Sequence, residues 1–336
     1  MSKLIVVTIS DDRFGRKGGL YSETQQKIKH IIENNPQLGI DGVQSWQWND
    51  VAATEWYQEN RVMLDNLDAA RNGRAYKPFV ILEALKSVEE GDYVVYTDCS
   101  PEMWKMDWNT IFPAMYYNSD VIKRLTNANN NILSVFIKWD RVDIPSGALG
   151  IHTHRYFTLN RCMDRMGMRQ YEDYYMCASG MWCIKKTKET MAFVEEWLKW
   201  NCDEECASLG RVAIADDYSF WVEEGHAEEG KEGNKLGHRH DQSIASLLLN
   251  RRDAKFVDIL HNDMNPYNFL QFMKTDVGYK FISGTPEKRT INIGDVVTND
   301  RGVELNVYRI ENGMYVVGKS LGSCYATTVD KLKLKI

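Results

Sequence analysis

Acidic side chains stand at two points where predicted secondary structure meets a loop. Asp98 follows the apolar strand pattern at 94–96, and Asp241 opens the helical pattern DQSIASLLLNRR. Loops at the carboxyl ends of sheet strands bind ligands in α/β proteins, so Asp98 is a candidate contact for a ligand or a metal ion. Each residue also has a purely structural explanation. Asp98 fits a turn residue before Pro101, and Asp241 fits a helix N-cap.

Cations near predicted helix starts and loops are candidates for binding an anionic ligand. Arg71, Arg74 and Lys77 stand near the start of a helix predicted over 77–90, and a helix N-terminus favours an anion. A basic surface face explains them equally well. Arg239 follows a long polar stretch and is a candidate partner for a diphosphate. The loop after the first predicted strand has two interpretations: it binds a diphosphate with its backbone N–H groups and positive charges, or it is a solvated turn. Its residues are Arg13, Arg16, Lys17, Gly18 and Gly19.

Histidines and cysteines give a weaker metal signal than the carboxylates. His152 and His154 alternate like strand residues on one face, but no third ligand accompanies them in the sequence. The seven cysteines show none of the paired C-x2-C spacings of a zinc module. An odd number of cysteines in a long chain without a secretion signal predicts reduced thiols rather than a disulfide framework.

The elements that must position these side chains alternate along most of the chain. A continuous β-branched run at 3–10 predicts a strand buried on both faces, followed by a loop and a helix. This alternation predicts an α/β fold with a mainly parallel sheet and flanking helices. Further strands are predicted around 94–96 and at 131–140, 176–187 and 254–260, with a strand and loop at 43–50; further helices are predicted at 51–72, 77–90, 188–201 and 241–252.

The pattern changes near Gly284, where short β runs begin to alternate with glycine and asparagine turns. Residues 285–336 are therefore predicted to form a separate small antiparallel β-barrel of the SH3-like kind, after a first domain at 1–284. The whole chain has a formal charge of −6, which argues against coating of nucleic acid or anionic membrane. With no apolar run of about 20 residues, we expect no membrane span and a cytoplasmic location.

Three segments, taken in order, resemble the GT-A type nucleotide-sugar glycosyltransferases of bacteria and viruses, phages included. YKPFVILEALKSVEEGDYVVYTDCS (76–100) is similar to the helix and strand that end in their Tyr-x-Asp motif. ASGMWCIKKTKETMAFVEEWL (178–198) is similar to their acceptor-side strand and helix, and HRHDQSIASLL (238–248) to their His-Asp-Gln-Ser signature. The resemblance spans about half of the chain and implies a Rossmann-like GT-A domain.

The resemblance also implies a metal ion and a role for each matching residue. Mn²⁺ or Mg²⁺ would bridge the diphosphate of the donor, and Asp98 matches the first acid of the D-x-D motif, whereas Ser100 replaces the second. His261 stands where such enzymes often place a further metal ligand, although a polar residue ending a strand explains it equally well. Asp98 and Asp241 would be catalytic. Donor contacts would come from Arg13, Arg71, Arg74, Lys77, Tyr96 and Arg239, and acceptor contacts from Trp182, His240 and Gln242.

The sequence therefore predicts an enzyme that moves a sugar from a nucleotide-sugar, with UDP favoured, to an acceptor hydroxyl. A glycan acceptor is slightly favoured. The first alternative is a transferase acting on hydroxymethylated pyrimidines in phage-type DNA, which the small β-barrel and the loop aromatics would suit. The second alternative is a binding protein for nucleotide-sugars or carbohydrates without catalytic activity, which the incomplete D-x-D motif would suit.

Overall fold

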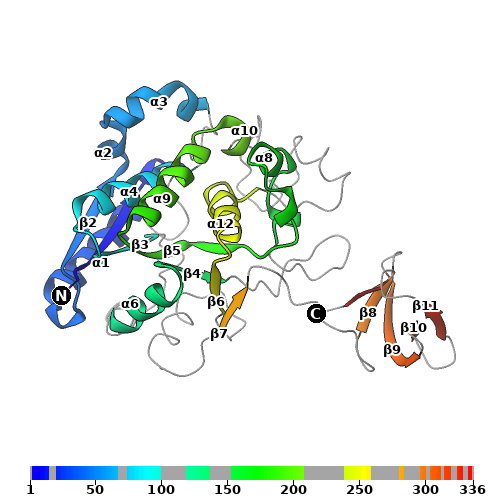
Figure 1. Cartoon of the computed structure of the whole chain (residues 1–336). Coiled ribbons are helices and arrows are strands. Elements are labelled where there is room, and N and C mark those ends of the chain that lie inside the picture. The colour runs from blue at the N-terminus through cyan, green and yellow to red at the C-terminus, as the bar shows by residue number, and fades with distance from the viewer. Residues whose placement is uncertain are drawn as a thin grey trace. The chain divides into compact units, whose positions relative to one another are not determined.

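The first compact unit of the chain contains a mixed seven-stranded sheet with helices on both faces (Figure 1). The structure is a computed structural model. It describes residues 2–14, 20–66, 74–99, 119–136, 153–207, 238–258, 280–283, 296–299, 303–311, 314–318, 324–327 and 332–334. The described residues up to 283 form the first unit, and those from 296 onward belong to the second.

The strand order of the large sheet is β2-β1-β3-β5-β4-β6-β7. The strands β1, β2, β3, β4 and β6 run in one direction, whereas β5 and β7 run against their neighbours. The predicted α/β fold with a mostly parallel core is confirmed, and the antiparallel strands β5 and β7 make the whole sheet a mixed one. The sequence did not show these two reversals, because side-chain patterns report burial and do not report strand direction. The strands are β1 (Leu4–Ser10), β2 (Gly42–Gln47), β3 (Tyr93–Thr97), β4 (Ile132–Phe136), β5 (Cys177–Lys185), β6 (Lys255–Asp258) and β7 (Lys280–Ser283).

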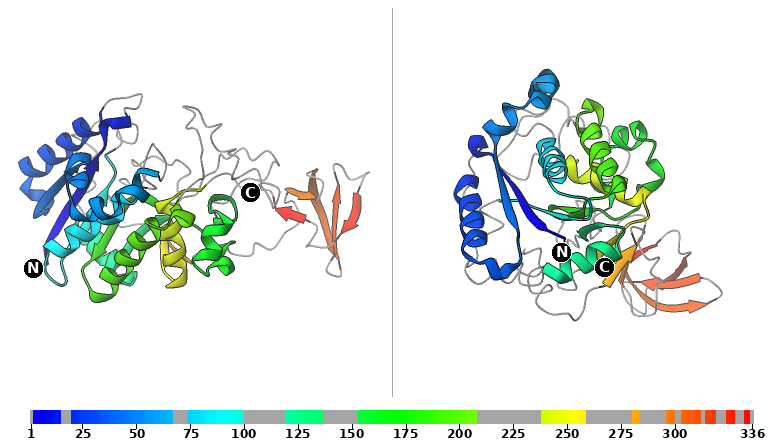
Figure 2. Two further views of the ribbon diagram at one scale, coloured as in Figure 1. Left: turned by 90° about the horizontal axis from the view of Figure 1, so that it is seen from above. Right: turned by 60° about the vertical axis from the view of Figure 1, so that its left-hand side comes forward.

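Two layers of helices cover the sheet: α1 and α6 lie on one face, and α4, α9 and α12 lie on the other (Figure 2). The alternation of buried side chains explains this arrangement. In β1, Ile5, Val7 and Ile9 belong to the large core under α4, α9 and α12, while Leu4 and Val6 face the opposite layer. The layers are α1 (Tyr21–Asn34), α6 (Ser119–Ala128), α4 (Tyr76–Ser87), α9 (Lys188–Asn201) and α12 (Asp241–Arg251).

Shorter helices fill the connections of the first unit. The helix predicted over 51–72 is corrected to two, α2 and α3, separated at Ala53 and Thr54. The Thr54 hydroxyl accepts a hydrogen bond from the Tyr57 backbone and so caps the second helix (3.2 Å). These elements are α2 (Trp48–Ala52), α3 (Glu55–Asn66), α7 (His154–Phe157), α8 (Asn160–Arg165), α10 (Glu204–Ala207) and the 3-10 turns η1 (Asp12–Phe14), η2 (Pro36–Leu38) and η4 (Arg169–Tyr171). Within the described residues no helix is long and apolar enough to cross a membrane.

The second unit contains a five-stranded antiparallel sheet in the order β11-β10-β9-β8-β12. This is the strand direction that the turn-rich tail predicted, and closure of the sheet into an SH3-like barrel stays a prediction. A bulge between Val316 and Val317 interrupts the pairing of β9 with β10. The strands are β8 (Val296–Asn299), β9 (Glu304–Glu311), β10 (Met314–Gly318), β11 (Cys324–Thr327) and β12 (Leu332–Leu334).

Candidate functional site

Asp98 stands one residue beyond β3 and keeps the strand's alternation. Its backbone N–H donates to the Gly180 carbonyl of β5 (2.9 Å), so the chain is still held to the sheet at this point. Since side chains alternate along a strand, Asp98 shares the face of Tyr96, which α4 and α12 cover. The Tyr96 hydroxyl donates to Asp98 Oδ1 (2.6 Å) and orients the carboxylate. About a quarter of the Asp98 side chain (26%) is exposed.

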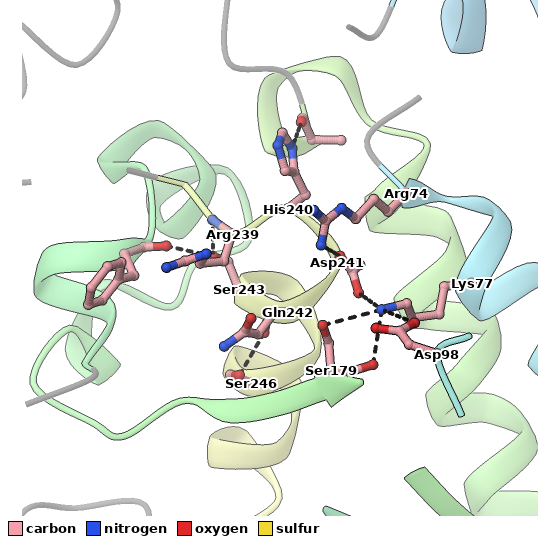
Figure 3. A network of polar contacts seen from close by, with 12 residues as sticks. Arg74, Lys77, Asp98, Ser179, Arg239, His240, Asp241, Gln242, Ser243 and Ser246 are labelled. Carbon is pink, nitrogen blue, oxygen red and sulfur yellow. Dashed lines mark hydrogen bonds and ion pairs between the residues drawn. The ribbon is translucent and has the colours of Figure 1, made fainter. Parts of the chain in front are cut away.

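Lys77, in the first turn of α4, is the centre of the site (Figure 3). Its side chain is only 2% exposed, yet its ammonium group reaches four oxygen atoms. Lys77 Nζ donates to the carbonyl (3.0 Å) and the hydroxyl (3.3 Å) of Ser179 in β5. It lies 3.3 Å from Asp98 Oδ1 and 3.1 Å from Asp241 Oδ2. Taking an ammonium group out of water costs several kcal/mol unless partners of this kind compensate it.

Asp241 is the first residue of α12, and its side chain is fully buried. The indole N–H of Trp197 donates to the Asp241 carbonyl (3.0 Å), and Arg74 Nη1 lies 4.0 Å from Asp241 Oδ1. Despite the ion pair with Lys77, neither carboxylate oxygen of Asp241 accepts a hydrogen bond from any residue that the structure describes. A fully buried carboxylate with unfilled hydrogen-bond capacity is unusual in folded proteins, which makes Asp241 a candidate functional residue.

The predicted N-cap role of Asp241 is corrected, because His240 occupies the N-cap position and Asp241 begins the helix. His240 and Arg74 both adopt a positive φ, of 46° and 56°. The other described non-glycine residues with positive φ are Asn130, Asn131 and Asp253. The ψ of −117° places His240 outside the left-handed helical region that residues with positive φ usually adopt. This unusual backbone directly precedes Asp241, and such strain concentrates at functional sites.

The charges of the site act on the tyrosines around it. Burial raises the pKa of Tyr96, and the negative charge of Asp98 raises it further. Burial likewise raises the pKa of Tyr76, which begins α4 and feels the charges of Arg74, Asp98, Asp241 and Asp11. Burial by itself lowers the pKa of Arg74, but Asp241 together with Tyr76, Asp98 and Tyr21 outweighs it, so the pKa is raised. Both tyrosines therefore stay neutral hydrogen-bond donors.

An aromatic platform lies at the carboxyl ends of β1 and β2. Trp48 packs edge-on against Tyr57 (5.3 Å between ring centroids) and Tyr76 (6.2 Å). The guanidinium carbon of Arg13 lies 3.4 Å from the centre of a Trp48 ring. Arg13 also donates from Nε (2.8 Å) and Nη2 (2.7 Å) to the two carboxylate oxygens of Asp11. Tyr76 connects this platform to the turn that carries Arg74 and Lys77.

The structure separates the remaining predicted contacts from this cluster. Arg239 lies over the Phe157 ring (5.3 Å), on the side of α12 away from the Asp241 carboxylate (Figure 3). The His240 ring donates from Nδ1 to the Ala207 carbonyl (2.8 Å). Gln242 is 8% exposed, and its amide nitrogen has no hydrogen-bond partner among the described residues.

Trp182 is corrected from an acceptor contact to a core residue. It is fully buried, its ring centroid is 4.9 Å from that of Trp197, and its indole N–H donates to the Ser179 carbonyl (3.2 Å). Tyr96, 1% exposed, is likewise placed behind Asp98 rather than in direct reach of a donor. The sequence pattern did not separate them because inward-facing and ligand-facing aromatic residues have the same strand periodicity.

Of the two predicted metal ligands, Asp98 lies within the described residues. Asp98 fits a hard divalent cation, since its partly exposed carboxylate offers oxygen at the edge of the sheet. His261, Arg71, Ser100, His152 and the glycines of the first loop lie outside the described residues. Within the described part of the chain, no three histidine, cysteine or acidic residues converge as a metal site.

Two functional candidates were not identified from the sequence, Ser179 and Asp11, whereas Trp48 is one of the loop aromatics noted there. Ser179 belongs to an apolar strand pattern that marks it only as a small polar residue, and its contact with Lys77 spans 102 positions. Asp11 directly follows a buried strand, so the rule that selected Asp98 would also have selected it.

No family model matches this chain, and no curated protein matches it.

Proposed function

We propose that this chain is a glycosyltransferase that moves a sugar from a nucleotide-sugar donor to an acceptor hydroxyl. The observation that carries the proposal is the convergence of the three segments that resemble such enzymes. Lys77 and Asp98 come from the first segment, Ser179 from the second and Asp241 from the third, and Lys77 contacts the other three. They meet at the carboxyl edge of the parallel strands, where α/β proteins bind nucleotides.

The platform beside this cluster suits the nucleoside of the donor. The face of Trp48 offers a stacking surface to a base, and Asp11 offers a carboxylate to an N–H group on the edge of that base. Uracil has such an N–H group, which agrees with the UDP-sugar that we propose as donor. Arg13 would leave the face of Trp48 when the base binds and pair with the diphosphate.

Asp98 and a divalent cation would hold the diphosphate at the end of β3. One carboxylate suffices if phosphate oxygens and water complete the shell, with His261 as the proposed additional ligand. When bound, Mn²⁺ or Mg²⁺ would offset the negative charge that develops on the leaving nucleoside diphosphate. Arg74 stands within reach of the same edge and would add a second positive charge. Tyr96 keeps the Asp98 carboxylate oriented through its hydroxyl.

In the reaction, an acceptor hydroxyl oxygen attacks the anomeric carbon while the bond from that carbon to the phosphate oxygen breaks. The bonding electrons leave with the diphosphate, and the hydroxyl proton passes to a carboxylate or to the leaving phosphate. We assign Asp241 to hydrogen bonding of sugar hydroxyls, because its oxygens have unfilled capacity and Lys77 already opposes its charge. The anomeric configuration of the product decides between inversion and retention.

For the second unit we propose an SH3-like barrel that binds the acceptor. The antiparallel order of β8 to β12 is compatible with such a barrel, and residues 285–336 carry a slight excess of basic side chains. We propose a glycan as the first acceptor to test. Duplex DNA containing hydroxymethylated pyrimidines is the second, because a small basic barrel also suits nucleic acid.

The proposal is tested by thermal stabilisation with UDP-, GDP-, ADP- and CMP-sugars, each with Mn²⁺ or with EDTA. A donor at one hundred times its dissociation constant stabilises the folded chain by about 2.7 kcal/mol, which a melting curve resolves. We expect a shift with UDP-sugars that EDTA abolishes, followed by slow hydrolysis of the donor. Asp98→Asn should lose the shift, and the exposed Asp173→Asn should retain it. No shift with any donor would reject the transferase, and a shift without hydrolysis or transfer would favour a binding protein.

A further inference from the structure

We propose that His240 is a positioning residue that turns the Asp241 carboxylate inward onto Lys77. This inference rests on the proposed function for its catalytic consequence, but its structural part can be tested separately. An aspartate at the start of a helix normally stabilises that helix by accepting a backbone N–H bond. Here neither Asp241 oxygen accepts one from the described residues, and the His240 side chain makes no capping bond either.

The backbone of His240 sets the direction of the next side chain. Its φ of 46° and ψ of −117° lie in a region that glycine adopts readily and other residues avoid. In this conformation the helix begins with Asp241 already on the side of α4, 3.1 Å from Lys77 Nζ. An ordinary extended N-cap would give the first turn a different direction.

Hydrogen bonds on both sides hold this unfavourable conformation. His240 donates from Nδ1 to the Ala207 carbonyl, and its own carbonyl accepts from the Ile244 backbone (3.1 Å). His238, two residues earlier, donates from Nε2 to the Cys206 carbonyl (2.6 Å). On the other side, Trp197 donates to the Asp241 carbonyl. The turn is therefore anchored to the end of α10 and to α9, and neither anchor uses the carboxylate.

Two unfavourable features thus occur at adjacent residues: a strained backbone at His240, and at Asp241 a buried carboxylate that accepts no hydrogen bond from the described residues. The ion pair with Lys77 compensates the charge of Asp241, but it does not remove the strain at His240. Strain that the surroundings maintain in this way is a mark of preorganised sites. The same turn also places Arg74, itself at positive φ, 4.0 Å from Asp241. We infer that the contacts that hold His240 in this conformation keep Asp241 ready for the sugar.

Three substitutions separate the backbone effect from the hydrogen bond. His240→Gly adopts the observed φ and ψ without strain, but it removes the bond to Ala207 and leaves the backbone freer, so the first turn loses an anchor and can move outward. His240→Asn tolerates positive φ and keeps a side-chain N–H donor. His240→Ala loses both the tolerance of positive φ and the side-chain N–H donor. We expect His240→Gly to melt no lower than the wild type while its kcat for transfer falls about tenfold with little change in donor KM. His240→Asn should restore most of the rate. Retained kcat in His240→Gly, or losses that simply follow the melting temperatures, would overturn the proposal.

A thermal cycle with Asp241→Asn tests the inference without any activity. In the wild-type background this substitution removes a carboxylate that is held inside the protein. In the His240→Gly background the carboxylate is free to turn outward, so the same substitution should change Tm by a different amount, with a difference of about 2 °C or more. Equal changes in both backgrounds would overturn the positioning role. If the wild type transfers no sugar but the cycle shows coupling, the proposed function fails and the inference about the turn stands.

Discussion

The charge balance around Lys77 predicts a large stability loss from Lys77→Met, a change that keeps the length of the side chain. Lys77 is 2% exposed and Asp241 is not exposed, so solvent cannot replace the lost ammonium group. Removing one partner of a buried ion pair costs about 3 to 5 kcal/mol. At about 2 to 4 °C per kcal/mol for a large domain, Tm should fall by about 6 to 20 °C. Calorimetry and urea unfolding measure the change.

Two comparisons make this prediction specific. Lys86→Met alters the same helix at an exposed lysine that pairs with Glu83, and it should change stability by no more than about 0.5 kcal/mol. The double variant Lys77→Met with Asp241→Asn removes both buried charges and should recover at least half of the loss, because no uncompensated buried carboxylate remains at Asp241. If Lys77→Met melts like Lys86→Met, or if the double variant melts lower than Lys77→Met alone, Lys77 is not the counter-charge of Asp241.

Three further predictions follow from other parts of the chain. Asp98→Ala should abolish metal-dependent donor binding and transfer while Tm falls by only a few degrees, because Asp98 is partly exposed. A large fall in Tm with transfer intact would show that Asp98 is a turn residue and not a ligand of the metal. Hydrogen bonding from Arg251 lowers the pKa of Glu196 below its usual 4.5, so this pair stabilises the fold above pH 4.5 and the gain is lost on acidification below it. Glu196→Gln should flatten that acid limb in urea unfolding by about 0.5 kcal/mol, and an unchanged limb would contradict the assignment. Deleting residues 286–336 should raise the acceptor KM and spare donor hydrolysis, whereas equal loss of both would mean that the second unit only supports the fold.

Residues that carry their own local signal were predictable from the sequence. Asp98 follows a buried strand, and β1, β3, α4, α9 and α12 appear where the apolar periodicity places them. The exceptions have local causes, such as the hydroxyl of Thr54, which begins a second helix inside a continuous helical pattern. Trp182 was assigned to the wrong environment because an aromatic ring in a strand looks the same whether it faces the core or a ligand.

By itself the sequence determined the α/β character of the first unit, the antiparallel strands of the tail, and two acidic residues at element ends. The tertiary structure alone decided that Lys77 is buried, that Ser179 and Asp241 are its partners, and that Arg13 contacts both Trp48 and Asp11. The physical reason is that periodicity reports only which face of an element is apolar. Whether a cation on that element is solvated or enclosed depends on oxygen atoms brought from other elements, and strand order and direction set those contacts. For Lys77 they come from β3, β5 and α12, which only the folded sheet brings to one edge.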